Sequence, residues 1–253
     1  MDNITYVKSV DRALKIIKLI SANKNMGVTE IAHQIDINKS AVHRILTTLV
    51  NHGFVEKDPE MNRYKIGYTF LEIASNLLES IDLREEALPF LKELETLTNE
   101  VIHLVVYDQG EVVYIEKLEG NETLRMHSKV GRRAPMHCTG VGKVILANLP
   151  RPMASNIIDQ KGLPKHTDKT ITDKEAFFRE LEKVEQQGYA IDDEENEDGI
   201  TCIAAPIFNH QKEITAAISI SGPTMRMTEN RIGELKGKIM SVGRKISSRL
   251  GYS

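Results

Sequence analysis

A row of hydrogen-bond donors in the first quarter of the chain carries the clearest chemistry in the sequence. Lys39, Ser40, His43, Arg44 and Thr47 recur at the three- and four-residue spacing of one helical face. They bring donors and little negative charge, which suits the acceptor-rich base edges in the major groove of DNA. An ordinary helical hairpin with a solvated polar face would show the same pattern, so the neighbouring elements must decide between the two interpretations.

The opposite face of this helix is apolar, and a shorter helix precedes it. The apolar stripe follows the order of a one-sided helix and consists of Val42, Ile45, Leu46, Leu49 and Val50. Residues 29–35 predict the preceding helix, and residues 36–38 form a polar turn. Two helices joined by a tight turn form a helix-turn-helix, whose second helix reads DNA. We therefore predict that Thr29 and the five donors contact DNA.

Two further elements predict a winged version of this motif. A supporting helix over residues 9–21 would present one apolar face, made of Val10, Ala13, Leu14, Ile17 and Ile20. Residues 54–66 predict two strands around a turn, which is a β-hairpin. As a wing, the hairpin would hold Arg63 and Lys65 beside phosphate or the minor groove. A hairpin that only covers the core is the alternative, but its place directly after the donor-bearing helix favours a wing.

The next segment, residues 67–82, predicts a linker helix that also pairs two chains. Its apolar residues Leu71, Ala74, Leu78 and Ile81 have heptad-like spacing. A lone helix cannot leave so much apolar surface in water, so this surface is either core or a dimer seam. We favour the seam, because one winged unit reads only a few base pairs whereas a two-fold dimer reads a palindrome.

Residues 1–66 thus form the predicted winged domain, and residues 83–253 predict an α+β domain with an antiparallel sheet and flanking helices. The elements expected along it are a helix with Pro89 in its first turn, strands at 101–108, 111–119, 123–129, 201–208 and 213–221, a polar loop at 131–135, an irregular stretch after Pro152, a helix with a capping box between Thr172 and Glu175, an acidic loop at 191–200, and a last helix at 229–250.

The composition excludes several classes of protein. The net charge is −3, but residues 1–66 hold 10 Lys and Arg against 7 Asp and Glu, which leaves −6 on the remainder. A basic unit on an acidic body fits DNA contact. Two cysteines give no disulfide framework and fit a reducing cytosol. Without a signal-peptide core or an apolar run of membrane-spanning length, the sequence predicts a cytoplasmic protein without membrane contact.

Three groups in the second domain could line a ligand pocket. Gly140 and Gly142 would let the backbone at a helix N-terminus approach a ligand, and exposed N–H groups there suit a carboxylate. Ser219 and Ser221 alternate along a strand, so both hydroxyls point to the same face. Cys202 lies on the neighbouring strand. Each of these residues alone also fits a structural role, since cysteine often serves as a small buried apolar residue.

Other chemistries lack the residues that they need. The GVGK run lacks the earlier glycine and the Ser or Thr of a phosphate loop. No Cys-His-Asn constellation can be placed for a thiol enzyme. We expect no metal site, because no CxxC or HxxxH spacing links Cys138, Cys202, His103 and His127. The acidic run from Asp192 lacks calcium-loop spacing, which predicts a solvated loop with Asp192 itself turned inward.

Several strings resemble the IclR family of bacterial transcription regulators, over nearly the whole chain. They are SVDRALKIIKLI, VTEIAHQI, KSAVHRILTTLV, MHCTGVGKVILA, GYAIDDEENEDGITCIAAPIF and AAISISGP. The strings of the second half are specific to the family, whereas the helix-turn-helix alone is not. The resemblance implies a winged helix-turn-helix, a linker helix and a GAF-like effector-binding domain. It also implies dimers or tetramers on palindromic operators, and both repressors and activators occur in the family.

The resemblance further implies a set of ligand contacts, and the family's ligands are commonly small organic acids or aromatic compounds. The positions that match its effector contacts are Met126, Ala134, Gly140, Val141, Asp192, Ile200, Cys202, Ser219 and Ser221. The small side chain of Ala134 would leave extra room in that pocket.

We therefore expect a ligand-responsive transcriptional regulator that binds double-stranded DNA, without a cofactor, and a repressor rather than an activator. An effector in the C-terminal pocket, which we predict to be a carboxylate, would reorient the linker and change the affinity for the operator. The alternative is a small-molecule sensor that uses the helix-turn-helix to dock on a protein partner. An enzyme would need a nucleophile and a base that the sequence does not offer.

Overall fold

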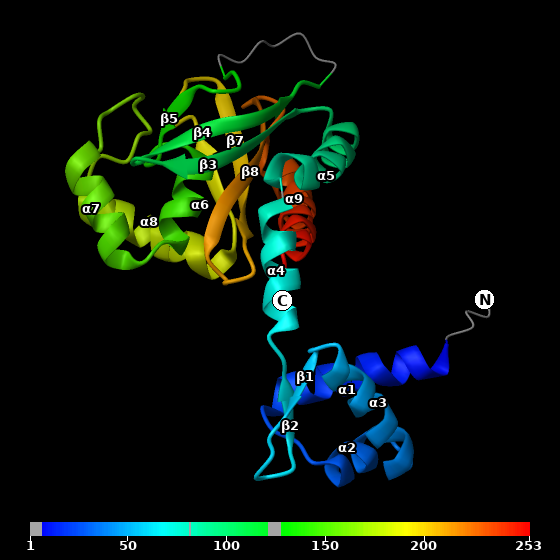
Figure 1. Ribbon diagram of the computed structural model, residues 1–253. Coiled ribbons are helices and arrows are strands. Elements are labelled where there is room, and N and C mark those ends of the chain that lie inside the picture. The colour runs from blue at the N-terminus through cyan, green and yellow to red at the C-terminus, as the bar shows by residue number, and fades with distance from the viewer. Residues whose placement is uncertain (1–6, 81, 121–127) are drawn as a thin grey trace. The chain divides into compact units, whose positions relative to one another are not determined.

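The computed structural model describes residues 7–80, 82–120 and 128–253 of the chain, except for the side chains of residues 75–80 (Figure 1). The chain divides into two units, Met1–Ile81 and Asp82–Ser253. Each unit has its own apolar core. Within the described ranges, no helix has the length and the apolar content to cross a bilayer.

The first unit is a winged helix-turn-helix followed by a fourth helix, as predicted. Its elements are α1 (Lys8–Asn23), α2 (Val28–Gln34), α3 (Lys39–Asn51), β1 (Val55–Lys57), β2 (Tyr64–Ile66) and α4 (Thr69–Ser80). The start of α3 is fixed by Asn38, whose Oδ1 accepts the N–H of Ala41 at 2.8 Å. This cap satisfies a backbone donor that the first helical turn leaves without a partner. The strands β1 and β2 pair antiparallel to form the wing.

The buried face of α1 differs from the predicted one. Ile16 and Ile20 are fully buried against α3 and β2, whereas Val10 and Leu14 remain 55% and 54% exposed. The apolar residues of α1 spread over more than one stripe, and packing against α3 and β2 selects the stripe of Ile16 and Ile20. An apolar surface therefore stays open on the N-terminal half of α1.

The second unit is built on a six-stranded antiparallel sheet. The strands lie in the order β5 (Arg133–Pro135), β4 (Glu111–Leu118), β3 (Val101–Asp108), β8 (Ile214–Pro223), β7 (Ile200–Phe208) and β6 (Ala190–Asp193). The strands β7 and β8 alternate small and branched apolar residues that are buried on both sides. Both faces of the sheet must therefore be covered, and the predicted α+β class is confirmed.

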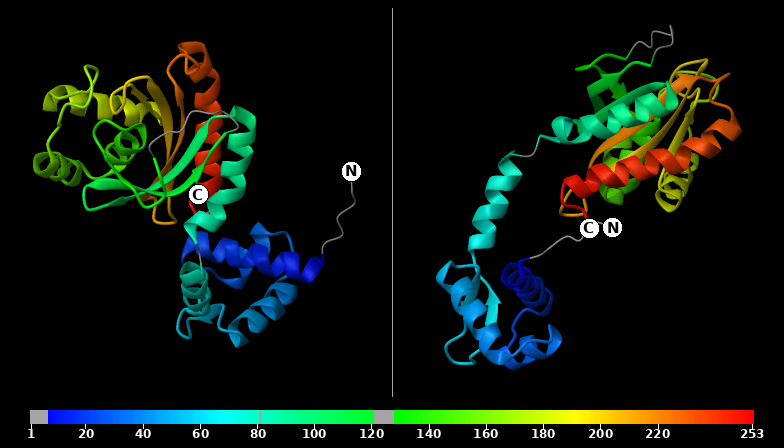
Figure 2. Two further views of the ribbon diagram at one scale, coloured as in Figure 1. Left: turned by 90° about the horizontal axis from the view of Figure 1, so that it is seen from above. Right: turned by 90° about the vertical axis from the view of Figure 1, so that its right-hand side faces the viewer.

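Helices cover the two faces of this sheet in two groups. One face carries α5 (Leu83–Thr98) and α9 (Glu229–Arg249), which pack side by side (Figures 1 and 2). The other face carries α6 (Gly140–Asn148) and α8 (Lys174–Gln187), with α7 (Arg151–Lys161) beside them. The core between α6, α8 and the sheet includes Val144, Phe177 and Leu181.

Two prolines occupy positions relative to the helices that differ from the predicted ones. Pro89 lies inside α5, because the helix already begins at Leu83 and is capped by Asp82, whose Oδ1 accepts the Arg84 N–H at 2.8 Å. Conversely, Pro152 opens α7 where an irregular stretch was expected. A missing N–H is harmless in a first helical turn.

Further predicted boundaries were wrong. The predicted loop at 131–135 contains the short edge strand β5, and the predicted acidic loop contains β6. The cap of α8 is Asp173, whose Oδ1 accepts the Ala176 N–H at 2.8 Å, and not Thr172. The predicted strand at 123–129 falls largely on residues 121–127, which lie outside the described residues.

The glycines of α6 also have a packing role that the sequence did not indicate. A Cβ on Gly142 would lie 2.3 Å from the backbone of Met136, and one on Gly140 would lie 3.3 Å from Ala204 Cβ. Gly142 thus lets the chain before α6 run directly against the helix. Gly140 packs on β7 and also contributes to the pocket described below.

The contact between Gly142 and the Met136 backbone predicts that alanine at position 142 destabilises the protein, although alanine usually stabilises a helix. Gly142→Ala should lower the free energy of unfolding by about 1–3 kcal/mol, because the added methyl overlaps main-chain atoms that cannot rotate away. Gly233→Ala is the matched control, since it lies in α9 with no atom within 4 Å of an added Cβ; it should stabilise by about 0.5–1 kcal/mol. Urea unfolding measures both. Equal effects of the two substitutions would contradict this account of Gly142.

Candidate nucleic-acid interface and ligand pocket

The predicted reading face of α3 is open to solvent. Lys39, Ser40, His43, Arg44 and Thr47 are all exposed, and so is Thr29 on α2. The buried face opposite holds α3 on the core of the first unit. Packing therefore aims this polar row outward, as a helix that enters a groove requires.

The five side chains are not equivalent as donors. The Ser40 hydroxyl donates to Asn38 Oδ1 at 2.8 Å, and the Thr47 hydroxyl donates to the carbonyl of His43 at 2.9 Å. Both hydroxyl protons are therefore engaged, and the two oxygens remain able to accept hydrogen bonds. Lys39 and Arg44 make no side-chain hydrogen bond or ion pair with any described residue, so their donors are available to a ligand.

The two wing residues predicted to contact DNA, Arg63 and Lys65, already have carboxylate partners. Arg63 Nη2 lies 2.7 Å from Glu30 Oε2 and donates to the Asn25 carbonyl at 3.0 Å, while Lys65 pairs with Glu56 at 2.9 Å. These pairs are partly exposed and contribute little to stability, so phosphate could displace the carboxylates. The sequence did not indicate this pairing, because Glu30 and Arg63 come from different elements.

A shallow hollow between α1 and α3 adds a basic residue that the sequence did not single out. It has a volume of about 320 Å³ and is lined by Arg12, Arg44, Ser9 and Thr48, among others. No acidic residue belongs to this lining. The Arg12 guanidinium group beside this hollow is suited to a backbone phosphate.

The predicted dimer seam is described only in part. On α4, Leu71 is 68% exposed and Ala74 is exposed as well. The side chain of Leu78 and all of Ile81 lie outside the described residues. The exposed apolar side chains of α4 and of the N-terminal half of α1 belong to the same unit.

In the second unit, the structure gathers the predicted ligand contacts around one cavity of about 330 Å³. Eight of the nine predicted residues line it: Ala134, Gly140, Val141, Asp192, Ile200, Cys202, Ser219 and Ser221. The ninth, Met126, lies outside the described residues. Further lining comes from His103, Tyr114, Ser128, Arg132, Arg133, Pro135, Thr139, His166, Asn196 and Glu197. The cavity lies where the start of α6 meets the sheet.

A hydrogen-bonded row of polar side chains crosses the sheet wall of the cavity. His103 Nδ1 lies 3.2 Å from Ser219 Oγ, Ser219 Oγ lies 3.3 Å from Ser221 Oγ, and His103 Nε2 lies 2.8 Å from Ser128 Oγ. Pairing of β3 with β8 sets His103 opposite Ser219. Burial lowers the pKa of His103 to about 3, so the ring is neutral and offers one donor and one acceptor.

The N-terminus of α6 presents free backbone donors to the cavity. Thr139 caps the helix by accepting the Gly142 N–H at 3.2 Å, and its carbonyl accepts the Lys143 N–H at 2.9 Å. The N–H groups of Gly140 and Val141 have no acceptor among the described residues, and both residues line the cavity. Together with the helix dipole they suit an anionic ligand group.

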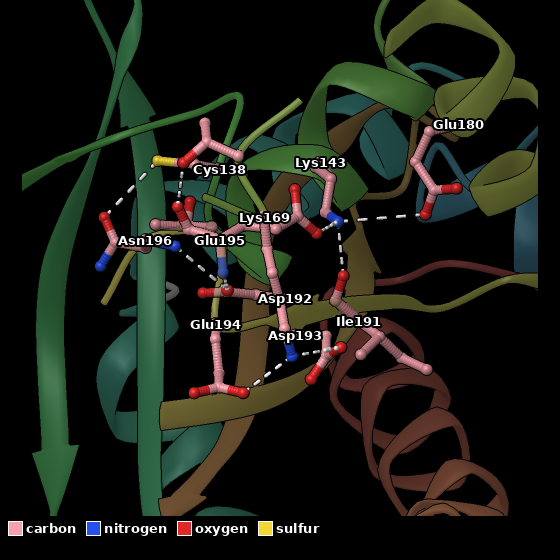
Figure 3. Close-up of polar contacts among 12 residues, drawn as sticks. Cys138, Lys143, Lys169, Glu180, Ile191, Asp192, Asp193, Glu194, Glu195 and Asn196 are labelled. Carbon is pink, nitrogen blue, oxygen red and sulfur yellow. Dashed lines mark hydrogen bonds and ion pairs between the residues drawn. The ribbon is translucent and has the colours of Figure 1, made fainter. Parts of the chain in front are cut away.

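A buried ion-pair network adjoins Asp192, which lines the cavity. Lys143 is 1% exposed, and its Nζ contacts Glu195 Oε1 and the Ile191 carbonyl, with Glu180 at 3.9 Å (Figure 3). Asp192 is also buried, as predicted, and accepts the backbone N–H groups of Glu195 and Asn196. The network fixes β6 and the turn after it against α6.

The electrostatics oppose thiol chemistry at the two cysteines. Burial raises the pKa of Cys138 to about 12, and burial also raises the pKa of Cys202. Both therefore remain protonated near neutral pH, and the thiolate is the reactive form of cysteine. Cys202 contributes a small, weakly polar wall to the cavity.

Several pocket residues were missed, and one signal could have found His103. It is the one polar side chain in the apolar run VIHLVV that begins the strand VIHLVVYD. A buried polar side chain in such a strand needs a partner, and Ser219 was already predicted to face a pocket. Residues such as Asn196 and His166 reach the cavity from loops, where periodicity carries no information.

The Lys143 network predicts strong coupling between its members. Lys143→Met should lower the free energy of unfolding by about 3–5 kcal/mol, because it leaves the Glu195 carboxylate buried without its partner. Adding Glu195→Gln should recover roughly half of that loss, because the uncompensated charge is removed. Urea unfolding of the wild type, the two single variants and the double variant measures the coupling between Lys143 and Glu195. Additive losses would contradict a direct Lys143–Glu195 interaction.

Asp192 predicts a pH dependence of stability. Burial raises its pKa from 3.8 to about 7, and Lys143 opposes this shift. The folded state therefore keeps a proton that the unfolded state loses between about pH 4 and 7, so this residue makes stability fall as pH rises through that window. Asp192→Asn should remove this part of the fall. Parallel stability profiles of wild type and variant from pH 4.5 to 7.5 would contradict the assignment.

Comparison with known proteins covers both units. The family described as bacterial transcriptional regulator IclR C-terminal matches residues 75–248, and the IclR helix-turn-helix domain matches residues 9–59. The chain is 36% identical over 246 residues to the HTH-type transcriptional regulator KdgR of Escherichia coli, covering 97% of this chain and 94% of KdgR. It is 32% identical over 248 residues to the transcriptional repressor IclR of the same species, covering 97% and 90%.

A solved structure agrees with these relatives. The IclR structure of Thermotoga maritima is 34% identical to this chain, has a TM-score of 0.66, and is matched over 98% of this chain and all of that chain. These two curated relatives are transcriptional regulators and not enzymes. The chain belongs to the IclR family of helix-turn-helix transcriptional regulators, which bind DNA and take a small-molecule effector in the C-terminal domain.

Proposed function

We propose that this chain is a repressor that binds a palindromic operator as a homo-oligomer, and that a small carboxylate in the C-terminal pocket changes its affinity for that operator. The observation that carries the ligand class is the pair of free N–H groups at Gly140 and Val141, at one end of a cavity whose sheet wall also carries the neutral ring of His103 and the hydroxyl groups of Ser219 and Ser221. A carboxylate at the helix N-terminus would interact favourably with the helix dipole and would accept hydrogen bonds from the two N–H groups. Hydroxyl or keto groups of the same ligand would meet Ser219 and His103.

In this proposal, residues 1–66 read DNA, residues 67–82 connect and pair the chains, and residues 83–253 sense the ligand in the cytoplasm. Apolar side chains of α1 and α4 that are left exposed, such as Val10 and Leu71, support the pairing. A two-fold pair presents two copies of α3 to two half-sites, which accounts for a palindrome. His43 and Arg44 on the outward face of α3 would contact bases. Arg12 on α1 and the basic side chains of the wing would contact phosphates.

The ligand class can be tested directly on the full-length protein. A thermal-shift screen should find small carboxylates that raise the melting temperature, whereas their amides should not, because a ligand stabilises by mass action only when it binds the folded state. Ser219→Ala should weaken the effect of an active carboxylate. Stabilisation by amides as strong as by the acids would contradict an anion site at α6.

The role of Arg44 predicts how specificity changes. On an operator selected from a random-sequence library, Arg44→Ala should weaken binding by about 1–3 kcal/mol and weaken binding to random DNA much less, if Arg44 reads a base. Arg44→Lys is the matched control, because it keeps the charge but loses the bidentate geometry. Fluorescence anisotropy at fixed salt measures both. Equal losses on operator and random DNA would make Arg44 a phosphate contact beside Arg12.

A further inference from the structure

The wing arginine Arg63 lies against the start of α2, because the backbone ties the two segments together. Met26 and Tyr64 exchange both of their backbone hydrogen bonds, at 3.0 and 2.8 Å, and both side chains are buried. This bridge attaches the start of β2 to the chain just before α2. Arg63 directly precedes the bridge, so the fold itself places its side chain beside the first turn of α2.

One nitrogen of Arg63 makes all the side-chain contacts that this residue has within the described part of the chain. Nη2 donates to the Asn25 carbonyl at 3.0 Å and lies 2.7 Å from Glu30 Oε2. The two hydrogens of Nη2 are used by these two acceptors. Nε and Nη1 contact no described residue, so three of the five guanidinium donors remain available to a ligand.

Glu30 has a second role besides this ion pair. Its Oε2 also accepts the backbone N–H of Gly27 at 3.0 Å, which caps the start of α2. The hydrogen bonds from Gly27 and Arg63 lower the pKa of the Glu30 carboxyl group, so it is ionised at neutral pH. The side chains of Glu30 and Arg63 are 48% and 36% exposed. Neither partner is enclosed, and a phosphate can approach the pair from solvent.

The position of this pair in the motif brings it close to bound DNA. The first helix of a helix-turn-helix crosses the sugar-phosphate backbone while the second enters the major groove. A guanidinium group beside the start of α2 therefore lies where a backbone phosphate passes. Two anions on one guanidinium group repel each other, so a phosphate and the Glu30 carboxylate compete for Arg63.

We propose that Glu30 competes with a DNA phosphate for Arg63, so that the wing engages DNA by exchanging its carboxylate partner for a phosphate. The inference rests on the proposed phosphate contact of the wing and adds the residue that controls it. Arg63 can keep its bond to Asn25, and Glu30 can keep its bond to Gly27, so the exchange needs only side-chain movement. Because every DNA complex must break the pair, Glu30 lowers the affinity for DNA of any sequence.

Binding of the full-length protein to a labelled duplex of arbitrary sequence tests the exchange without an operator or an effector. Glu30→Gln should raise the affinity about 2- to 5-fold, which corresponds to the cost of breaking a partly exposed ion pair. Glutamine also serves in a capping box, so α2 should keep its start. Glu60→Gln is the matched control, since Glu60 lies exposed in the turn of the wing and its carboxylate contacts no described residue; its effect should be smaller.

The double variant distinguishes competition from simple charge repulsion. Arg63→Ala should weaken binding and reduce the salt slope by about one for each wing on the DNA, measured over about 50–200 mM salt. In the Arg63→Ala background, Glu30→Gln should have no more effect than Glu60→Gln, because no pair is left to break. Fluorescence anisotropy measures all of these affinities.

Three results would overturn the proposal. They are an equal gain from Glu30→Gln with and without Arg63, a loss of affinity in Glu30→Gln, and an Arg63→Ala variant that binds DNA like the wild type. Each of them would leave the proposed regulatory function standing, because the wild type still binds DNA. A wild-type protein that binds no duplex at all would overturn the proposed function as well, so the two failures are distinguishable.

Discussion

A buried positive charge organises the ligand-binding unit. The ammonium group of Lys143 has almost no contact with solvent, so it must be neutralised inside the protein. Glu195 and the Ile191 carbonyl meet this need, and they come from the turn after β6 and from β6 itself. The requirement therefore fixes α6 against β6, and with it the free N–H groups of Gly140 and Val141 and the carboxyl group of Asp192 at the cavity. Gly140, whose Cα lies close to the backbone of Ala190 and Asp192, is at this contact between α6 and β6.

Much of the fold could be predicted from local patterns. The helix-turn-helix and the alternating apolar strands can be recognised from the periodicity of apolar residues, which is visible in a single sequence. The errors fall where tertiary contacts override local preference. Pro89 is accepted within α5 because that helix packs on α9 and the sheet along its length, and Pro152 could not be placed without knowing that Ile157 and Ile158 are buried. The short strands β5 and β6 form only because a neighbouring strand offers its edge.

The sequence predicted only part of the pocket lining. Eight residues that the family resemblance indicated do line one cavity, but this shows their position and not their ligand. The residues that were missed reach the cavity through pairing across the sheet, as His103 does with Ser219, or through loops, as His166 does. Such neighbours are set by the tertiary fold.

The proposed function requires that a ligand in the pocket of the second unit change the DNA affinity of the first. The measurement is the operator dissociation constant of the full-length protein at fixed salt, with and without a saturating carboxylate that stabilises the wild type more than Ser219→Ala. The account predicts a change of about 5- to 150-fold in the wild type, the usual range of coupling between two sites. An operator affinity that stays the same while the pocket is saturated would contradict it.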